Sequence, residues 1–141
     1  MSTRSTTHFR TSLDAKSTAI VYRHHDGYPE GAGVDLLKFV EQVKEQCEGT
    51  SYGTRFNDDY YLAAKYLMFL VMDGYKYDID TPLNFGGVGI LDQDPGDIEY
   101  RYIVVADGTP TIYVQEIGWP GHSSDGEPVL LKEVLEGQAA L

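Results

Sequence analysis

The chain contains one cysteine, Cys47, so no disulfide bond can form within it. Chains without disulfides are typical of reducing compartments. No apolar run approaches the roughly 20 residues that a membrane-spanning helix needs. The first twelve residues, MSTRSTTHFRTS, lack the apolar core of a secretory signal. These absences predict a soluble, cytoplasmic protein that has no membrane partner.

Positive charge is also scarce. Eleven lysines and arginines stand against 22 aspartates and glutamates, which gives a formal net charge of −11. A nucleic-acid-binding protein uses lysine and arginine to displace condensed counterions, so we expect no direct binding to nucleic acid. The acidity has two interpretations that the sequence leaves open. It serves solubility, or it forms an acidic surface that mimics nucleic acid and binds a basic partner.

The length of 141 residues fits one domain. Residues 1–11 are rich in serine and threonine without periodicity, which predicts a flexible tail or at most an edge strand. Residues 12–141 are expected to form the single domain. Apolar spacing predicts helices over 34–49 and 57–74, and a short helix over 128–137. Strands are expected over 17–25, within 81–93, and as a hairpin over 97–118. The order predicts an α+β fold: an antiparallel sheet of about four strands with two main helices packed on one face and a short C-terminal helix.

The stretch VYRHHDGYP, residues 21–29, carries the most distinctive chemistry. In an extended strand Tyr22, His24 and Asp26 project to one side, and Arg23 to the other. An aspartate beside a histidine favours the imidazolium and fixes its tautomer, which is half of a general acid/base pair. The alternative is structural: Asp-Gly is a common turn pair, and the segment then only steers the chain from strand to helix.

The glycine-rich segment PEGAGV, residues 29–34, leads directly into a predicted helix. Backbone amides near a helix N-terminus suit an anion. We therefore expect this loop to bind a small polar, nucleotide-like ligand, with tyrosines stacking on a base and an arginine contacting phosphate. The candidate ligand-binding residues are Tyr22, Arg23, His24, Asp26, Gly27, Tyr28 and Arg55.

The same stretch resembles the opening motif of an uncharacterised group of small proteins from phages, prophages and microbial genomes, with the pattern Tyr-x-His-x-Asp-Gly-Tyr-Pro. The match runs from Tyr22 to Pro29 and includes the later Gly33. Members of this group often carry cysteine where this chain has Arg23 and tryptophan where it has His25. The resemblance implies an aromatic stacking position at His25 and a phage or mobile-element context, but no particular activity.

Other patterns are less specific. Asp92, Asp94 and Asp97 supply the carboxylates of a calcium site, but their spacing departs from the EF-hand and favours a solvated turn. The run His122, Ser123 and Asp125 has the residue types of a catalytic triad, but a triad needs groups that the fold sets in place. Arg101 is expected to pair across the hairpin with Glu116.

We therefore expect no metal, no cofactor and no assigned catalytic residue. Three functions stay open: a ligand-binding module, an acidic inhibitor of anti-defence type that blocks a basic host protein, and a hydrolase or lyase that uses His24 and Asp26. An enzyme is the least favoured of these, because neither a nucleophile nor a third metal ligand is visible. The oligomeric state, a homo-oligomer included, is also left open.

Overall fold

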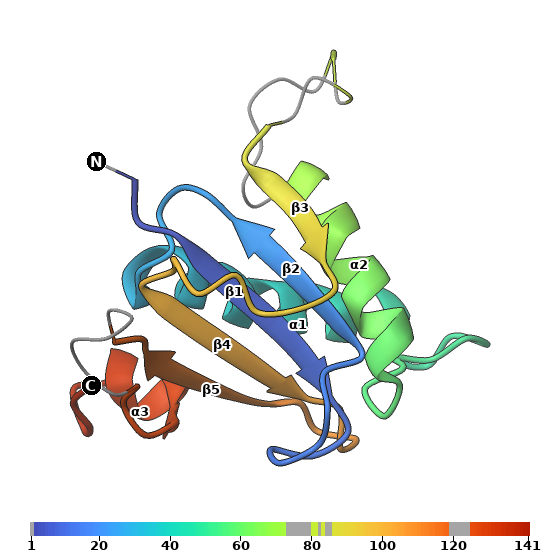
Figure 1. Cartoon of the computed structure of the whole chain (residues 1–141). Coiled ribbons are helices and arrows are strands. Elements are labelled where there is room, and N and C mark those ends of the chain that lie inside the picture. Colours follow the sequence, from blue (N-terminus) through green and yellow to red (C-terminus); the bar gives the residue numbers. More distant parts are fainter. Residues whose placement is uncertain (1, 73–79, 82, 84–85, 119–124) are drawn as a thin grey trace.

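The computed structural model describes residues 2–72, 80–81, 83, 86–118 and 125–141. Over these residues the chain forms a six-stranded sheet, with helices α1 and α2 packed behind it (Figure 1). The strands are β1 (Ser5–Arg10), β2 (Ala19–Arg23), β3 (Val88–Leu91), β4 (Tyr100–Val105), β5 (Thr111–Glu116) and β6 (Val129–Leu130). The helices are α1 (Val34–Cys47), α2 (Asp59–Met72) and α3 (Leu131–Leu135), and a π-helical turn, η1 (Pro29–Gly33), precedes α1.

The α+β class is confirmed, and the sheet is larger than predicted and mixed. Its order is β3-β2-β1-β4-β5-β6. Strand β1 pairs antiparallel with β2 but parallel with β4. The predicted hairpin is present as β4 and β5, which pair antiparallel from Tyr100 opposite Glu116 to Val105 opposite Thr111.

The expectation of a flexible tail over residues 1–11 is corrected, because β1 lies in the interior of the sheet. Its polar residues Ser5, Thr6, Thr7 and His8 are all at most 3% exposed. The sequence of β1 lacks the alternation of apolar and polar residues that marks a half-buried strand. Two of its buried polar side chains bond to each other, since Nε2 of His8 lies 3.1 Å from the hydroxyl of Thr6, and Nδ1 of His8 lies 2.7 Å from the hydroxyl of Ser17.

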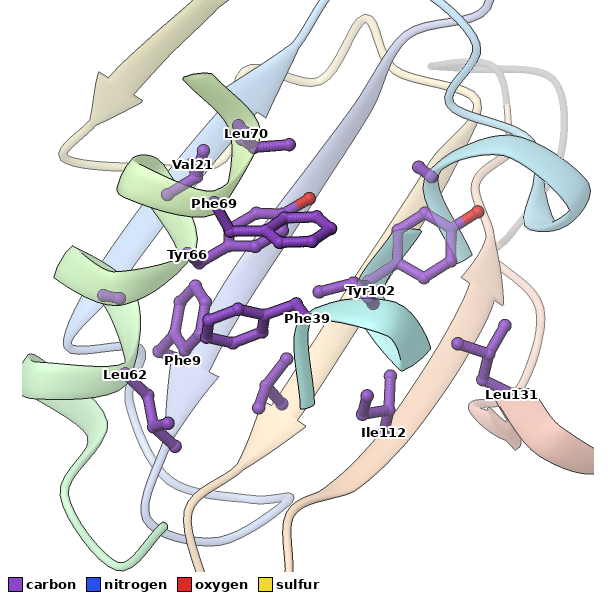
Figure 2. Close-up of a cluster of buried hydrophobic side chains, with 14 of the residues drawn as sticks. Phe9, Val21, Phe39, Leu62, Tyr66, Phe69, Leu70, Tyr102, Ile112 and Leu131 are labelled. Atoms are coloured by element: carbon purple, nitrogen blue, oxygen red, sulfur yellow. The ribbon is translucent and has the colours of Figure 1, made fainter. Parts of the chain in front are cut away.

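The core fills the space between the sheet and the two long helices (Figure 2). Four aromatic rings meet there, from Phe9 on β1, Phe39 on α1, and Tyr66 and Phe69 on α2. The side chain of Asp58 caps α2 by accepting a hydrogen bond from the amide of Tyr61 at 3.2 Å.

The opposite face of the sheet is crossed by residues 92–99, which run from the end of β3 to the start of β4 (Figure 1). Ile98 in this segment is 5% exposed, and Asp94 bonds to Arg101 of β4. Among the described residues no helix combines the length and the apolarity that a membrane span requires.

Candidate functional site

The VYRHHDGYP stretch leaves the sheet after Arg23, the last residue of β2. The amide of His24 donates to the carbonyl of Gly87 at 2.7 Å, and Asp26 has a φ of 55°, in the left-handed region. The strand therefore ends before Asp26, so the predicted alternation of side chains between the two faces of the sheet does not extend to this residue. The adjacent imidazoles of His24 and His25 meet edge-on, with ring centroids 4.7 Å apart.

Each polar group of the expected pair contacts a phenol. Nδ1 of His24 lies 2.7 Å from the hydroxyl of Tyr22, and the hydroxyl of Tyr28 donates to Oδ1 of Asp26 at 3.2 Å. The structure thus joins His24 to Tyr22 and Asp26 to Tyr28. His24 is half-buried, whereas Asp26 and Tyr28 are exposed.

Arg23 points to the face of the sheet that packs against the helices, opposite to Tyr22, as predicted. Its Nη1 lies 2.8 Å from Oδ2 of Asp35 on α1, and its Nε donates to the carbonyl of His25 at 2.8 Å. Its side chain is 5% exposed. This guanidinium therefore holds the loop onto α1, and its charge is matched by Asp35.

Three amides of the glycine-rich loop bond within the protein. Gly27 donates to Thr3 at 2.9 Å, Gly31 to Tyr28 at 2.9 Å, and Ala32 to Asp26 at 2.8 Å. The buried hydroxyl of Tyr102 donates to the carbonyl of Gly27 at 2.6 Å. The pattern fixes a compact junction between β2 and α1, and these three amides are not directed at an external anion.

Arg55 lies at the other end of the sheet from this loop. The carbonyl of its neighbour Phe56 accepts a hydrogen bond from the amide of Gly108, which lies just beyond the end of β4. The VYRHHDGYP loop instead follows the end of β2, which lies near the start of β4. The Arg55 guanidinium lies over the ring of Tyr61, 4.9 Å from its centroid. The structure therefore does not bring Arg55 together with the other candidate residues.

Carboxylates gather instead at the end of the sheet where β4 begins. Burial raises the pKa of the Tyr100 phenol, and Glu116, Glu30 and Glu99 raise it further. These three glutamates come from the end of β5, from η1 and from the segment before β4. Nearby, burial also raises the pKa of the Tyr22 phenol. The charge of Arg4 lowers this pKa, and the charges of Asp97 and Glu99 raise it. We call this surface the acidic end: it comprises Asp26, Glu30, Asp97, Glu99 and Glu116.

Arg4, a cation at the acidic end, is already engaged with its carboxylates. Arg4 pairs with Asp97 at 2.9 Å, and its amide donates to Glu99 at 2.6 Å. Within the described part of the chain Glu30 and Glu116 form no ion pair, and both side chains are exposed. The acidic end is thus an exposed negative surface with tyrosines among its carboxylates.

Arg101 corrects a prediction about the hairpin. It lies opposite Gln115 rather than Glu116, and its Nη1 donates to Oε1 of Gln115 at 2.8 Å. It forms ion pairs with Asp94 and, at 3.5 Å, with Asp125. Glu116 lies opposite Tyr100, which leaves its charge at the acidic end.

No metal site is assembled by the three aspartates that the sequence suggested for calcium, Asp92, Asp94 and Asp97. Asp94 bonds to Arg101 and Asp97 to Arg4, so two of the three carboxylates are used in ion pairs. Over the residues that the structure describes, no group of three histidine, cysteine, aspartate or glutamate side chains could hold a metal ion. Of the triad-like run, His122 and Ser123 lie outside the described residues, and Asp125 accepts a hydrogen bond from the amide of Gly118 at 3.1 Å.

Sequence reasoning missed one buried histidine. Nδ1 of His8 lies 2.7 Å from Oγ of Ser17, which also accepts a hydrogen bond from Nε of Arg10 at 2.9 Å. Burial lowers the pKa of His8 to about 3, and the charges of Arg10 and Arg101 contribute. A general base works best with a pKa near the working pH. This contact therefore serves the packing of the β1–β2 turn rather than the activation of Ser17.

No model of a known protein family matches the chain, and neither a curated protein nor a solved structure matches it.

Proposed function

We propose that the protein is an acidic interaction protein whose acidic end binds a surface rich in lysine and arginine on a partner protein. The observation that carries this proposal is that carboxylates from three separate segments lie at one end of the sheet: Glu116 lies opposite Tyr100 in the hairpin, and Glu116, Glu30 and Glu99 all raise the pKa of the Tyr100 phenol. The net charge of −11 is consistent with it.

A basic partner would change the electrostatic energy of this surface. Like charges held close together repel one another, and the attraction of a bound cationic surface offsets that repulsion. The rings of Tyr28 and Tyr100 offer π faces for guanidinium or ammonium groups. Opposite potentials also speed encounter between the two surfaces. Protein surfaces that bind DNA or RNA are cationic in this way. In a mobile-element context, the proposed protein would therefore act as an inhibitor that mimics nucleic acid.

Two matched double variants test the proposal. Glu30→Gln/Glu116→Gln removes two charges from the acidic end, and Glu45→Gln/Glu48→Gln removes two exposed charges from the C-terminal end of α1. Helix α1 begins next to the acidic end and has 14 residues, so at about 1.5 Å per residue the control charges lie roughly 20 Å away. The probe is a peptide of alternating lysine and arginine, titrated by calorimetry.

The proposal expects the acidic-end variant to weaken binding by about three- to tenfold, as two exposed ion pairs would, and the control variant to change it by less than about twofold. Binding should also fall steeply in about 1 M salt, where the screening length is about 3 Å. Equal losses in the two variants, or affinity that ignores salt, would contradict the proposal.

The earlier expectation of a nucleotide-like ligand stays a prediction. Tyr22 and His24 are half-buried and Tyr28 is exposed, so these groups can contact solvent. A thermal-shift screen of nucleotides on the wild type and on His24→Ala separates this function from the one proposed. A ligand lost in His24→Ala would support it, and peptide binding would be unaffected by that variant.

A further inference from the structure

A hollow in the molecule lies between α1, the start of β5 and α3. Figure 1 shows α3 beside β5. The volume of the hollow is about 680 Å³. The cavity borders Thr109 to Ile112 at the start of β5, whereas the acidic end includes Glu116 at the end of that strand. No residue of the acidic end lines the cavity, and the inference below does not depend on the proposed function.

The lining of this cavity combines aliphatic and charged side chains with Pro110 and three neutral polar residues, Thr109, Thr111 and Gln138. Aliphatic groups come from all three elements and from β6: Leu37, Val40, Ile112, Leu130 and Leu135. Charged groups come from the helices: Glu41 on α1, Lys132 and Glu133 on α3, and Glu136 just after α3. Three carboxylates against one ammonium leave a net charge of −2 around an apolar lining.

We infer that this cavity binds a small linear alkylammonium compound. Its volume lies within the roughly 300–1,000 Å³ typical of small-molecule sites, which are mostly apolar with a few polar groups that fix orientation. The aliphatic lining favours a hydrocarbon chain. The three glutamates favour a cationic head group, and the same charges repel a fatty acid, so the sign of the head group is the distinguishing feature.

The probes are n-octylammonium, octanoate and octanol, each titrated into the intact protein by calorimetry. The inference expects saturable one-to-one binding of n-octylammonium, weaker binding of octanol, and the weakest binding of octanoate. Glu133→Gln/Glu136→Gln should weaken n-octylammonium binding by about three- to tenfold, whereas Glu45→Gln/Glu48→Gln should change it by less than about twofold.

A blocking variant keeps the test independent of charge. Val40 is half-buried on α1 and lines the cavity, so Val40→Trp should fill the space and abolish binding while circular dichroism still shows a folded protein. The inference is overturned if Val40→Trp binds n-octylammonium as the wild type does. It is also overturned if Val40→Trp is unfolded and Glu133→Gln/Glu136→Gln binds n-octylammonium as the wild type does. Octanoate binding more tightly than n-octylammonium, or no saturable binding of the ammonium, would overturn it as well.

Discussion

The guanidinium of Arg23 lies 2.8 Å from the carboxylate of Asp35, and the two side chains are 5% and 17% exposed. This ion pair joins the end of β2 to the first turn of α1, across the VYRHHDGYP loop. An arginine that the sequence suggests for phosphate binding is thus part of the framework that positions the loop.

Removal of this buried charge should destabilise the fold strongly. Arg23→Ala leaves Asp35 without its partner in a poorly solvated place, and we expect the free energy of unfolding to fall by about 3–5 kcal/mol. Asp97→Asn breaks the exposed ion pair with Arg4, in which the side chains of Arg4 and Asp97 are 37% and 65% exposed. This change should lower the free energy of unfolding by at most about 1 kcal/mol. Urea unfolding of both variants measures the difference, and similar losses would show that Arg23 is not a framework residue.

His8 should make stability depend on acid pH. Its pKa in the fold is about 3, below its ordinary value of 6.5, so the unfolded chain takes up this proton first as the pH falls. The free energy of unfolding should therefore decrease from about pH 6.5 down to about pH 3, by up to about 1.4 kcal/mol per pH unit from this group.

The variant His8→Gln isolates that contribution from the carboxylates, which titrate in the same range. Urea unfolding of the wild type and the variant at a series of pH values gives two curves, and their difference should slope across this window. Parallel curves would mean that His8 is not held neutral in the fold.

A side chain at Gly31 should destabilise the loop junction. A Cβ there would lie 2.4 Å from the carbonyl oxygen of Asp26, which accepts the amide of Ala32. We expect Gly31→Ala to lower the free energy of unfolding by about 1–3 kcal/mol. Gly89→Ala is the matched control, because no atom lies within 4 Å of a Cβ built there, and its thermal unfolding should be close to that of the wild type. A Gly31→Ala protein of wild-type stability would refute the packing described for this loop.

The sequence predicted the elements whose signals are local. Helix α1 follows from the three- and four-residue spacing of Leu36, Val40 and Val43, and the β4–β5 hairpin follows from two alternating segments around a turn. Strand β1 carried no such signal, because four of its buried residues, Ser5 to His8, are polar, and only Phe9 is apolar.

The candidate site shows the same limit. The loop residues lie together because they are consecutive, so their proximity was predictable, but Arg55 is placed by the start of α2 and lies at the far end of the sheet. Glu30, Glu99 and Glu116 are distant in sequence, and only the pairing of Tyr100 with Glu116 within the predicted hairpin could have suggested part of the acidic end.

The central claim is that basic partners bind at the acidic end, and amide chemical-shift mapping tests it most directly. The ¹⁵N-labelled protein is titrated with the lysine–arginine peptide. The account predicts that the largest shifts fall on residues 26–30, 97–100 and 116, and that they disappear in about 1 M salt. Shifts centred on Glu45 and Glu48, or spread evenly over the acidic residues, would contradict it.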